Sequence, residues 1–241
     1  MKKILIVMAL ISVLFLVGCN QKRNRVLENM DNQQQNLAEN QEINSTENNS
    51  AINDNELEEK ELISLAYSNE SISIPNVNIN SDDAKKVNEE LNQKLEGDIT
   101  GYKASYKYNI SENILSLLIE NISTVIDNYT WYDVYNFDIN SGRLLSTSDV
   151  LGQQKSIKLM DKLPEICSEE FYKYWADTIT DKNDEGTKFY HKENQKLVAN
   201  NIDEVPCYID SEKGQQIIIK IASFAGPSDY EHIVNLNDYM E

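Results

Sequence analysis

Two histidines, each close to an acidic residue, are the first candidates for chemistry in this chain of 241 residues. His191 lies two positions before Glu193, and His232 directly follows Glu231. A histidine beside a carboxylate can act in acid–base catalysis or bind a metal ion, but a histidine in a polar surface loop is the more common case. The chain contains no phosphate-binding glycine loop, no Gly-x-Ser-x-Gly and no His-Glu-x-x-His motif. We therefore predict no catalytic residue, no metal ligand and no cofactor, and a protein that is not an enzyme.

Acidic residues are abundant, and two kinds of site could be built from them. Residues 181–186 read Asp-Lys-Asn-Asp-Glu-Gly, which begins like a calcium-binding loop. The twelfth position is Lys192 instead of the bidentate glutamate that such a loop requires, so a weak cation site is the alternative to an ordinary loop. A pair of carboxylates acting on peptidoglycan is a second alternative, although nothing in the sequence brings two of them together.

The clearest chemical signal is a cysteine at the end of the N-terminal apolar run. Two lysines precede an apolar stretch over 4–17, which is too short to cross a membrane comfortably but suits a signal peptide. Residues 16–19 read Leu-Val-Gly-Cys and resemble the bacterial lipobox, in which the cysteine is acylated and becomes the new N-terminus. We predict a signal peptide over 1–18 and acyl chains such as palmitate on Cys19. The protein is then anchored at the extracytoplasmic face of the cell membrane.

Cys167 and Cys207 are the two cysteines that remain. In exported proteins such a pair can form a disulfide, and closing a loop of this length would stabilise the fold by roughly 4 kcal/mol. The alternative is a pair of buried free thiols. The sequence leaves both alternatives open.

The chain is strongly acidic, with 40 Asp and Glu residues against 22 Lys and Arg residues and a formal net charge of −18. This composition lacks the basic surface that nucleic-acid binding requires, so we expect no nucleic-acid partner. The charge would repel anionic polymers of the envelope and attract cationic partners, while solubility alone is the simpler explanation.

The composition changes sharply after Cys19. Residues 20–55 are rich in Asn and Gln and contain no aromatic residue, glycine or proline. Such a segment buries too little apolar surface to offset the entropy of ordering it. We predict a disordered tether over 19–60, with a weak helix near 54–62 as the alternative, followed by one folded domain over 61–241.

The folded part reads as an α+β domain, because strand patterns and helix patterns occur in separate runs. Apolar and polar residues alternate over 102–110 and over 129–139, which predicts strands with one buried face. Residues 114–126 are apolar nearly throughout and predict a central strand buried on both faces, with a bulge near Asn121. With a turn at Gly142 and a short return strand, these segments predict an antiparallel meander of about four strands. Further strands are expected at 71–75, 206–210, 216–223 and 233–236.

Helices are expected to cover this sheet. Ser81 is a suitable N-cap for a helix that ends at Gly97 and has its apolar residues on one face. Pro164 is expected to separate a short helix over 156–162 from a second one, because proline does not fit the interior of a regular helix. The polar segment 181–201 is expected to be a loop. One stripe of the second helix is predicted to be core and not a ligand platform; it consists of Cys167, Phe171, Tyr174, Trp175 and Thr178.

A family resemblance rests on the segment around the turn at Gly142. Residues 134–145 read Val-Tyr-Asn-Phe-Asp-Ile-Asn-Ser-Gly-Arg-Leu-Leu, and 148–151 read Ser-Asp-Val-Leu. The pattern resembles the aromatic-Asn-Phe-Asp-x-x-x-Gly-(Lys/Arg)-x-Leu hallmark of a bacterial extracytoplasmic module. That module occurs in the lysozyme-sensing anti-sigma-V factor and ahead of the catalytic domain in PdaC-type peptidoglycan deacetylases. The resemblance extends over residues 62–237, with 72–77 similar to its opening segment and 206–210 to its closing strands.

The same comparison shows one departure. Many members carry a Gly-Gly-Ala-His-like stretch before the hallmark strand, whereas residues 125–129 here read Val-Ile-Asp-Asn-Tyr. The resemblance implies a binding or sensing module of the cell envelope without an effector domain, and it identifies no ligand. Together with the anchor, the tether and the acidity of the chain, it leads us to expect wall glycan or a cationic protein such as lysozyme as the ligand. A structural or assembly lipoprotein that pairs through a sheet edge is a further alternative.

Overall fold

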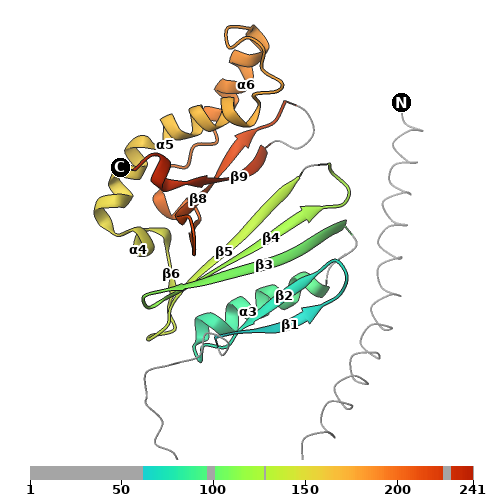
Figure 1. Ribbon diagram of the computed structural model, residues 1–241, viewed down its shortest axis with the longest axis vertical. Helices are drawn as coiled ribbons and strands as arrows, with labels where there is room; N and C mark the ends of the chain where they lie inside the picture. The colour runs from blue at the N-terminus through green and yellow to red at the C-terminus, as the bar shows by residue number, and fades with distance from the viewer. Residues whose placement is uncertain (1–61, 97–100, 128, 225–228, 241) are drawn as a thin grey trace, which may run out of the picture. The chain divides into compact units, whose positions relative to one another are not determined.

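The computed structural model of the chain describes residues 62–96, 101–127, 129–224 and 229–240. The signal peptide expected over 1–18, the acylation site at Cys19 and the whole tether expected over 19–60 lie outside the described residues. Within those ranges, no helix has the length and apolar character needed to cross a membrane. The predicted α+β class is confirmed, because the domain is built from antiparallel sheets packed with helices (Figure 1).

The central layer is the predicted antiparallel meander. It contains β3 (Tyr102–Ser111), β4 (Ile114–Ser123), β5 (Thr130–Asp138) and the short β6 (Leu144–Leu145), in that order. The prediction of a buried central strand is confirmed, since Leu115 and Leu118 are buried on opposite faces of β4. The bulge expected near Asn121 is wrong, because pairing with both neighbouring strands continues without a shift through that residue.

The first outer layer covers one face of this sheet. It consists of the hairpin β1 (Ile63–Ser68) and β2 (Ser73–Val77) and of helix α3 (Asp82–Glu96). The predicted helix is confirmed, and Ser81 Oγ accepts a hydrogen bond from Ala84 N at 3.1 Å as an N-cap should. β1 was not predicted. The strand expected at 71–75 is β2, which runs through Pro75 to Val77 beside a shift in the β1–β2 pairing.

A second sheet lies against the other face of the meander. It contains β7 (Cys207–Asp210), β8 (Gly214–Ala222) and β9 (Asp229–Asn235), which confirms the predicted hairpin and last strand. The two sheets meet through an apolar cluster of Leu118, Tyr208 and Ile218. Two hydrogen bonds join the sheets: Asn136 Nδ2 donates to the Cys207 carbonyl at 2.8 Å, and Ile209 N donates to Ser116 Oγ at 2.9 Å. Ser116 Oγ in turn donates to Asn136 Oδ1 at 2.6 Å within the meander.

Helices cover the far face of the second sheet: α4 (Thr147–Leu151), α5 (Gln153–Tyr174) and α6 (Glu185–Gln195) (Figure 1). The break expected at Pro164 is wrong, since α5 runs through it. Leu159, Leu163 and Ile166 are buried on both sides of the proline, so packing outweighs the one lost backbone hydrogen bond. Thr178 lies beyond the end of α5 and is exposed, so it does not belong to the predicted core stripe.

The loop expected over 181–201 is also wrong, because it contains α6. Asp184 caps this helix by accepting a hydrogen bond from Thr187 N at 3.1 Å. A fully buried asparagine, Asn194, fixes its other end to the core through hydrogen bonds to the Cys167 carbonyl and the Ala222 amide. These partners are distant in sequence, so the local polarity of the segment concealed the helix. Short 3₁₀ helices complete the chain at Ile202–Glu204 and Leu236–Asp238.

Candidate functional site

Neither histidine pairs with the acid beside it in the sequence. His232 on β9 instead meets Glu170 on α5, with Nε2 and Oε2 3.0 Å apart. Glu170 also accepts hydrogen bonds from Lys173 Nζ at 2.8 Å and from the Tyr239 hydroxyl. Burial pushes the pKa of Glu170 upward, but these three hydrogen bonds outweigh burial, and the pKa lies below its ordinary value. The ionised carboxylate therefore ties the C-terminal segment to α5.

His191 on α6 faces a different part of α5. Its Nε2 lies 2.8 Å from Ser168 Oγ, and its ring stacks on Tyr172 with centroids 5.0 Å apart. Burial lowers the pKa of His191, which favours the neutral ring near pH 7. These contacts join two helices, and a packing role accounts for them.

In the segment that begins like a calcium loop, two aspartate side chains accept hydrogen bonds from the backbone. Asp184 is the N-cap of α6, and Asp181 Oδ1 accepts a hydrogen bond from Asn183 N at 2.8 Å. Across the described part of the chain, no group of three or more His, Cys, Asp or Glu side chains is placed to hold a metal ion.

Cys167 and Cys207 are buried free thiols in the same core cluster, which is the second of the two alternatives that the sequence leaves open. Burial raises the pKa of Cys167 to about 11 and that of Cys207 to about 12. Thiols with such high pKa values are poor nucleophiles at neutral pH. Cys167 also lines a small pocket of about 260 Å³ together with apolar residues such as Leu163.

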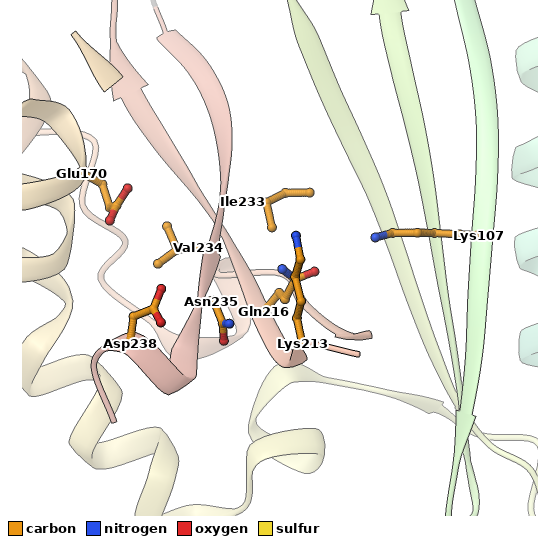
Figure 2. Close-up of a pocket in the computed structure, with 8 residues that line it drawn as sticks. All are labelled: Lys107, Glu170, Lys213, Gln216, Ile233, Val234, Asn235 and Asp238. Atoms are coloured by element: carbon orange, nitrogen blue, oxygen red, sulfur yellow. The ribbon is translucent and has the colours of Figure 1, made fainter. Parts of the chain in front are cut away.

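A more open pocket of about 450 Å³ lies along β9 (Figure 2). Two of its charged groups are already engaged: Glu170 in the network above, and Lys107 in an ion pair with Asp210 at 2.9 Å. Figure 2 shows these two side chains on opposite sides of β9, directed at no common point. The lining is Lys107, Glu170, Lys213, Gln216, Ile233, Val234, Asn235 and Asp238. This arrangement does not bring two reactive groups onto one substrate.

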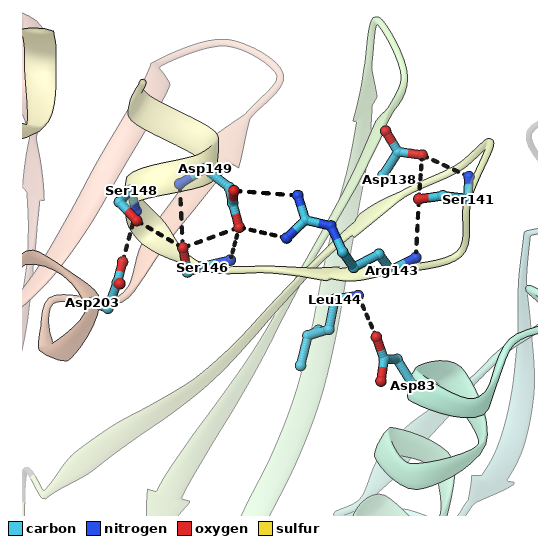
Figure 3. Close-up of polar contacts among 9 residues, drawn as sticks. All are labelled: Asp83, Asp138, Ser141, Arg143, Leu144, Ser146, Ser148, Asp149 and Asp203. Atoms are coloured by element: carbon cyan, nitrogen blue, oxygen red, sulfur yellow. Dashed lines mark hydrogen bonds and ion pairs between the residues drawn. The ribbon is translucent and has the colours of Figure 1, made fainter. Parts of the chain in front are cut away.

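The residues that carry the family resemblance hold the fold together (Figure 3). Both terminal nitrogens of Arg143 donate hydrogen bonds to the carboxylate of Asp149, Nη1 to Oδ2 at 2.8 Å and Nη2 to Oδ1 at 3.2 Å. These hydrogen bonds, together with one from Ser146 N, lower the pKa of Asp149 to about 2. Ser146 in turn caps α4 by accepting from Asp149 N, which forms a capping box.

The same region connects three segments that are distant in sequence (Figure 3). Ser148 N donates to Asp203 Oδ1 at 2.8 Å, which joins α4 to the 3₁₀ helix at Ile202–Glu204. Leu144 N donates to Asp83 at 2.9 Å, which joins the turn to the start of α3. Gly142 has φ of +69° and packs against Ser81, so a side chain at that position would clash. The residues around Gly142 are thus engaged in contacts within the fold.

An aromatic surface lies at the opposite end of the meander, where β4 turns into β5. The rings of Tyr102 and Trp131 have centroids 5.6 Å apart, and those of Tyr129 and Trp131 are 5.7 Å apart. All three are half-buried, so part of each ring faces solvent. The ring of Tyr129 also packs against that of Tyr230 in the second sheet, with centroids 6.0 Å apart, which links the two sheets at this end.

Three exposed aliphatic residues lie in or next to the turn that joins β4 to β5. Ile122, Val125 and Ile126 are 40%, 79% and 42% exposed. Ser123 Oγ accepts hydrogen bonds from both Val125 N and Ile126 N, so the turn is internally braced. Clustered exposed apolar side chains with aromatic neighbours are typical of a binding surface. Val125 and Ile126 in this turn, with Tyr102, Tyr129 and Trp131 at the same end of the sheet, form the tip surface. Ile122 lies on the opposite face of β4 from Asn121 and Trp131 and is not part of it.

A polar cluster lies under one edge of the tip surface. Asp133 on β5 forms an ion pair with Lys94 near the end of α3, and both side chains are about a quarter exposed. Asn121 on β4 is 1% exposed and donates from Nδ2 to Asp133 Oδ2 at 2.9 Å. The Tyr102 hydroxyl donates to the Lys94 carbonyl at 3.2 Å, so the ring and the cluster belong to one unit.

The tip surface and the polar cluster were not predicted. Tyr102 and Trp131 fit the alternating strand pattern that predicts buried side chains. That pattern does not distinguish a fully buried side chain from one that is half exposed at the end of a strand. The one available signal was the departure at 125–129, where two aliphatic residues occupy a turn.

No known protein family matches this chain, and a search of curated proteins finds no similar sequence. The resemblance to the extracytoplasmic module stays a prediction from residues 134–151.

Proposed function

We propose that the protein is a membrane-anchored extracytoplasmic lipoprotein whose α+β domain binds a ligand of the cell envelope without catalysing a reaction. Wall glycan and a cationic protein such as lysozyme are the two ligand classes. The proposal places acyl chains on Cys19 and the folded domain outside the membrane, joined by a tether over 19–60. Two or three acyl chains would make the anchor stable, since each buried CH₂ contributes about 0.8 kcal/mol.

The observation that carries the binding role is the tip surface. Exposed aliphatic residues and half-buried aromatic rings gather there at one end of a rigid sheet. Such surfaces lose apolar contact with water when a ligand covers them, which drives binding. The acidity of the chain is a second reason to expect binding, because a net charge of −18 would attract a cationic ligand by long-range electrostatics.

The test uses the full-length protein extracted from membranes in detergent. It is mixed with purified peptidoglycan sacculi or with immobilised lysozyme, each at low and at raised salt. Retention on sacculi that withstands salt supports the glycan, whereas retention on lysozyme that salt abolishes supports electrostatic capture of a basic protein. Failure to bind either one would overturn the binding role.

The same mixtures test the carboxylate-based enzyme. Release of soluble glycan fragments from the sacculi would replace the non-catalytic proposal with a hydrolase. Location is tested separately by replacing Cys19 with serine, which should move the protein from the membrane fraction to the soluble fraction. If the C19S protein instead stays with the membrane and is shielded from protease added to whole cells, the lipoprotein assignment is wrong.

A further inference from the structure

Asn121 has one buried acceptor without a partner. Its Nδ2 faces two acceptors, Asp133 Oδ2 at 2.9 Å and the Trp131 carbonyl at 3.4 Å, and this fixes the orientation of the amide. Its Oδ1 then points away from them and receives no hydrogen bond from any residue that the structure describes. Buried polar atoms in folded proteins almost always have a partner, so this oxygen calls for a donor from beyond the described residues.

The groups around Asn121 restrict what that donor can be. The ammonium of Lys94 already neutralises the carboxylate of Asp133, so the cluster carries no net charge. A cationic side chain would meet Lys94, and an anionic one would meet Asp133 and the acidic surface of the chain. A neutral ligand that both donates and accepts hydrogen bonds can pair with Asn121 Oδ1 and with the remaining protons of Lys94.

Aromatic rings flank this polar cluster. Trp131 lies opposite Asn121 in the β4–β5 register, and the rings of Tyr102 and Tyr129 both contact the Trp131 ring. Rings of this kind offer an apolar face to a flat, partly apolar ligand and keep their polar atoms for hydrogen bonds. A sugar ring has the matching character, with C–H groups on its faces and hydroxyl or acetamido groups at its edge.

We propose that the polar cluster and Trp131 form a subsite for one neutral sugar unit that carries hydroxyl or acetamido groups. One hydroxyl or amide N–H of the sugar donates to Asn121 Oδ1, Lys94 donates to a sugar oxygen, and the sugar face packs on Trp131. Lys94 is long and a quarter exposed, so its displacement opens the path to Asn121. The inference rests on the proposed binding function and favours its glycan ligand over the cationic protein.

The experiment measures binding of a soluble chain of N-acetylglucosamine units to the full-length protein in detergent. The chain has two tryptophans, so W175F leaves Trp131 as the sole fluorescent reporter. We expect the sugar to change the Trp131 emission, and N121L to weaken binding about tenfold, the loss of one hydrogen bond to a buried acceptor. The matched control is F189A on α6, which removes an exposed aromatic residue away from this site and should leave the affinity unchanged.

A second variant keeps the inference falsifiable if N121L folds poorly. K94M retains the apolar stem but removes the ammonium, so it should weaken sugar binding and strengthen binding of an oligolysine peptide to the freed Asp133. Equal sugar affinity in N121L, K94M and wild type would overturn the subsite. Binding to sacculi without binding to the soluble sugar would overturn the subsite alone, whereas no binding to sacculi or lysozyme would overturn the proposed function as well.

Discussion

Two buried asparagines, one in each half of the domain, differ in how completely the fold uses them. Asn194 in the C-terminal half is fully buried; its Nδ2 donates to the Cys167 carbonyl at 2.9 Å and its Oδ1 accepts from Ala222 N at 2.8 Å. Asn121 in the N-terminal half is 1% exposed, yet its Oδ1 has no partner among the described residues. The amide of Asn194 therefore has partners for both its nitrogen and its oxygen, whereas the oxygen of Asn121 has none among the described residues.

The contrast extends to the charged groups of the two halves. In the C-terminal half, buried Glu170 is surrounded by Lys173, His232 and Tyr239, so the fold uses its carboxylate. In the N-terminal half, Lys94 and Asp133 pair beside half-exposed rings and keep about a quarter of their surface in solvent. Buried polar groups that are fully paired specify a fold, and those left incomplete at a surface are where a ligand can act.

The largest expected effect on stability comes from removing the two hydrogen bonds of Asn194 in the C-terminal half. N194L should lower the free energy of unfolding by about 2–5 kcal/mol, because two buried backbone groups lose their partners at roughly 1–3 kcal/mol each. Urea denaturation followed by circular dichroism measures this change. A loss below about 1 kcal/mol would mean that α6 is not held by Asn194, and the contrast between the two halves would fail.

A smaller effect, dependent on pH, is expected at Glu170. Its pKa is lowered in the folded protein, so the stability that it contributes is present above the unfolded value of about 4.3 and is lost as the pH falls through the folded value. The difference in unfolding free energy between wild type and E170Q should stay constant from neutral pH down to about 5 and shrink below about 4. E185Q is the control, because the side chain of Glu185 is 91% exposed and forms a surface ion pair with Lys188. A difference that persists unchanged at low pH would contradict the ionised network.

The sequence was sufficient where the pattern is local. Helix α3 follows from its cap at Ser81 and its single apolar face, and the meander follows from alternation along β3 and β5 with an apolar β4 between them. Pro164 and α6 were predicted wrongly because their outcome depends on tertiary packing: a buried face that continues past the proline, and a polar segment fixed by Asn194. Local propensity is overridden when such distant contacts are strong enough.

The candidate site was beyond the sequence for a related reason. Asn121 occurs in an apolar run, where it suggested a bulge; its true role depends on Asp133 across the strand pair and Lys94 on a separate helix. His232 and Glu170 are also far apart in the chain, and their neighbours Glu231 and Glu169 gave no hint of the pairing. Side chains converge through strand register and helix placement, neither of which a single sequence displays.

The smallest expected effect is the most informative for the contrast. N121L should change the free energy of unfolding by less than about 1 kcal/mol, although the residue is as deeply buried as Asn194. Leucine has a similar volume, and it removes an acceptor that is already unpaired. The two hydrogen bonds that Asn121 Nδ2 donates are also lost, but Asp133 keeps its ion pair with Lys94 and is a quarter exposed, and the contact with the Trp131 carbonyl is long at 3.4 Å, so little is left newly unsatisfied. Urea denaturation of N121L and N194L side by side makes the comparison. If N121L costs as much as N194L, then Asn121 Oδ1 has a partner within the chain, and both the contrast and the sugar subsite lose their basis.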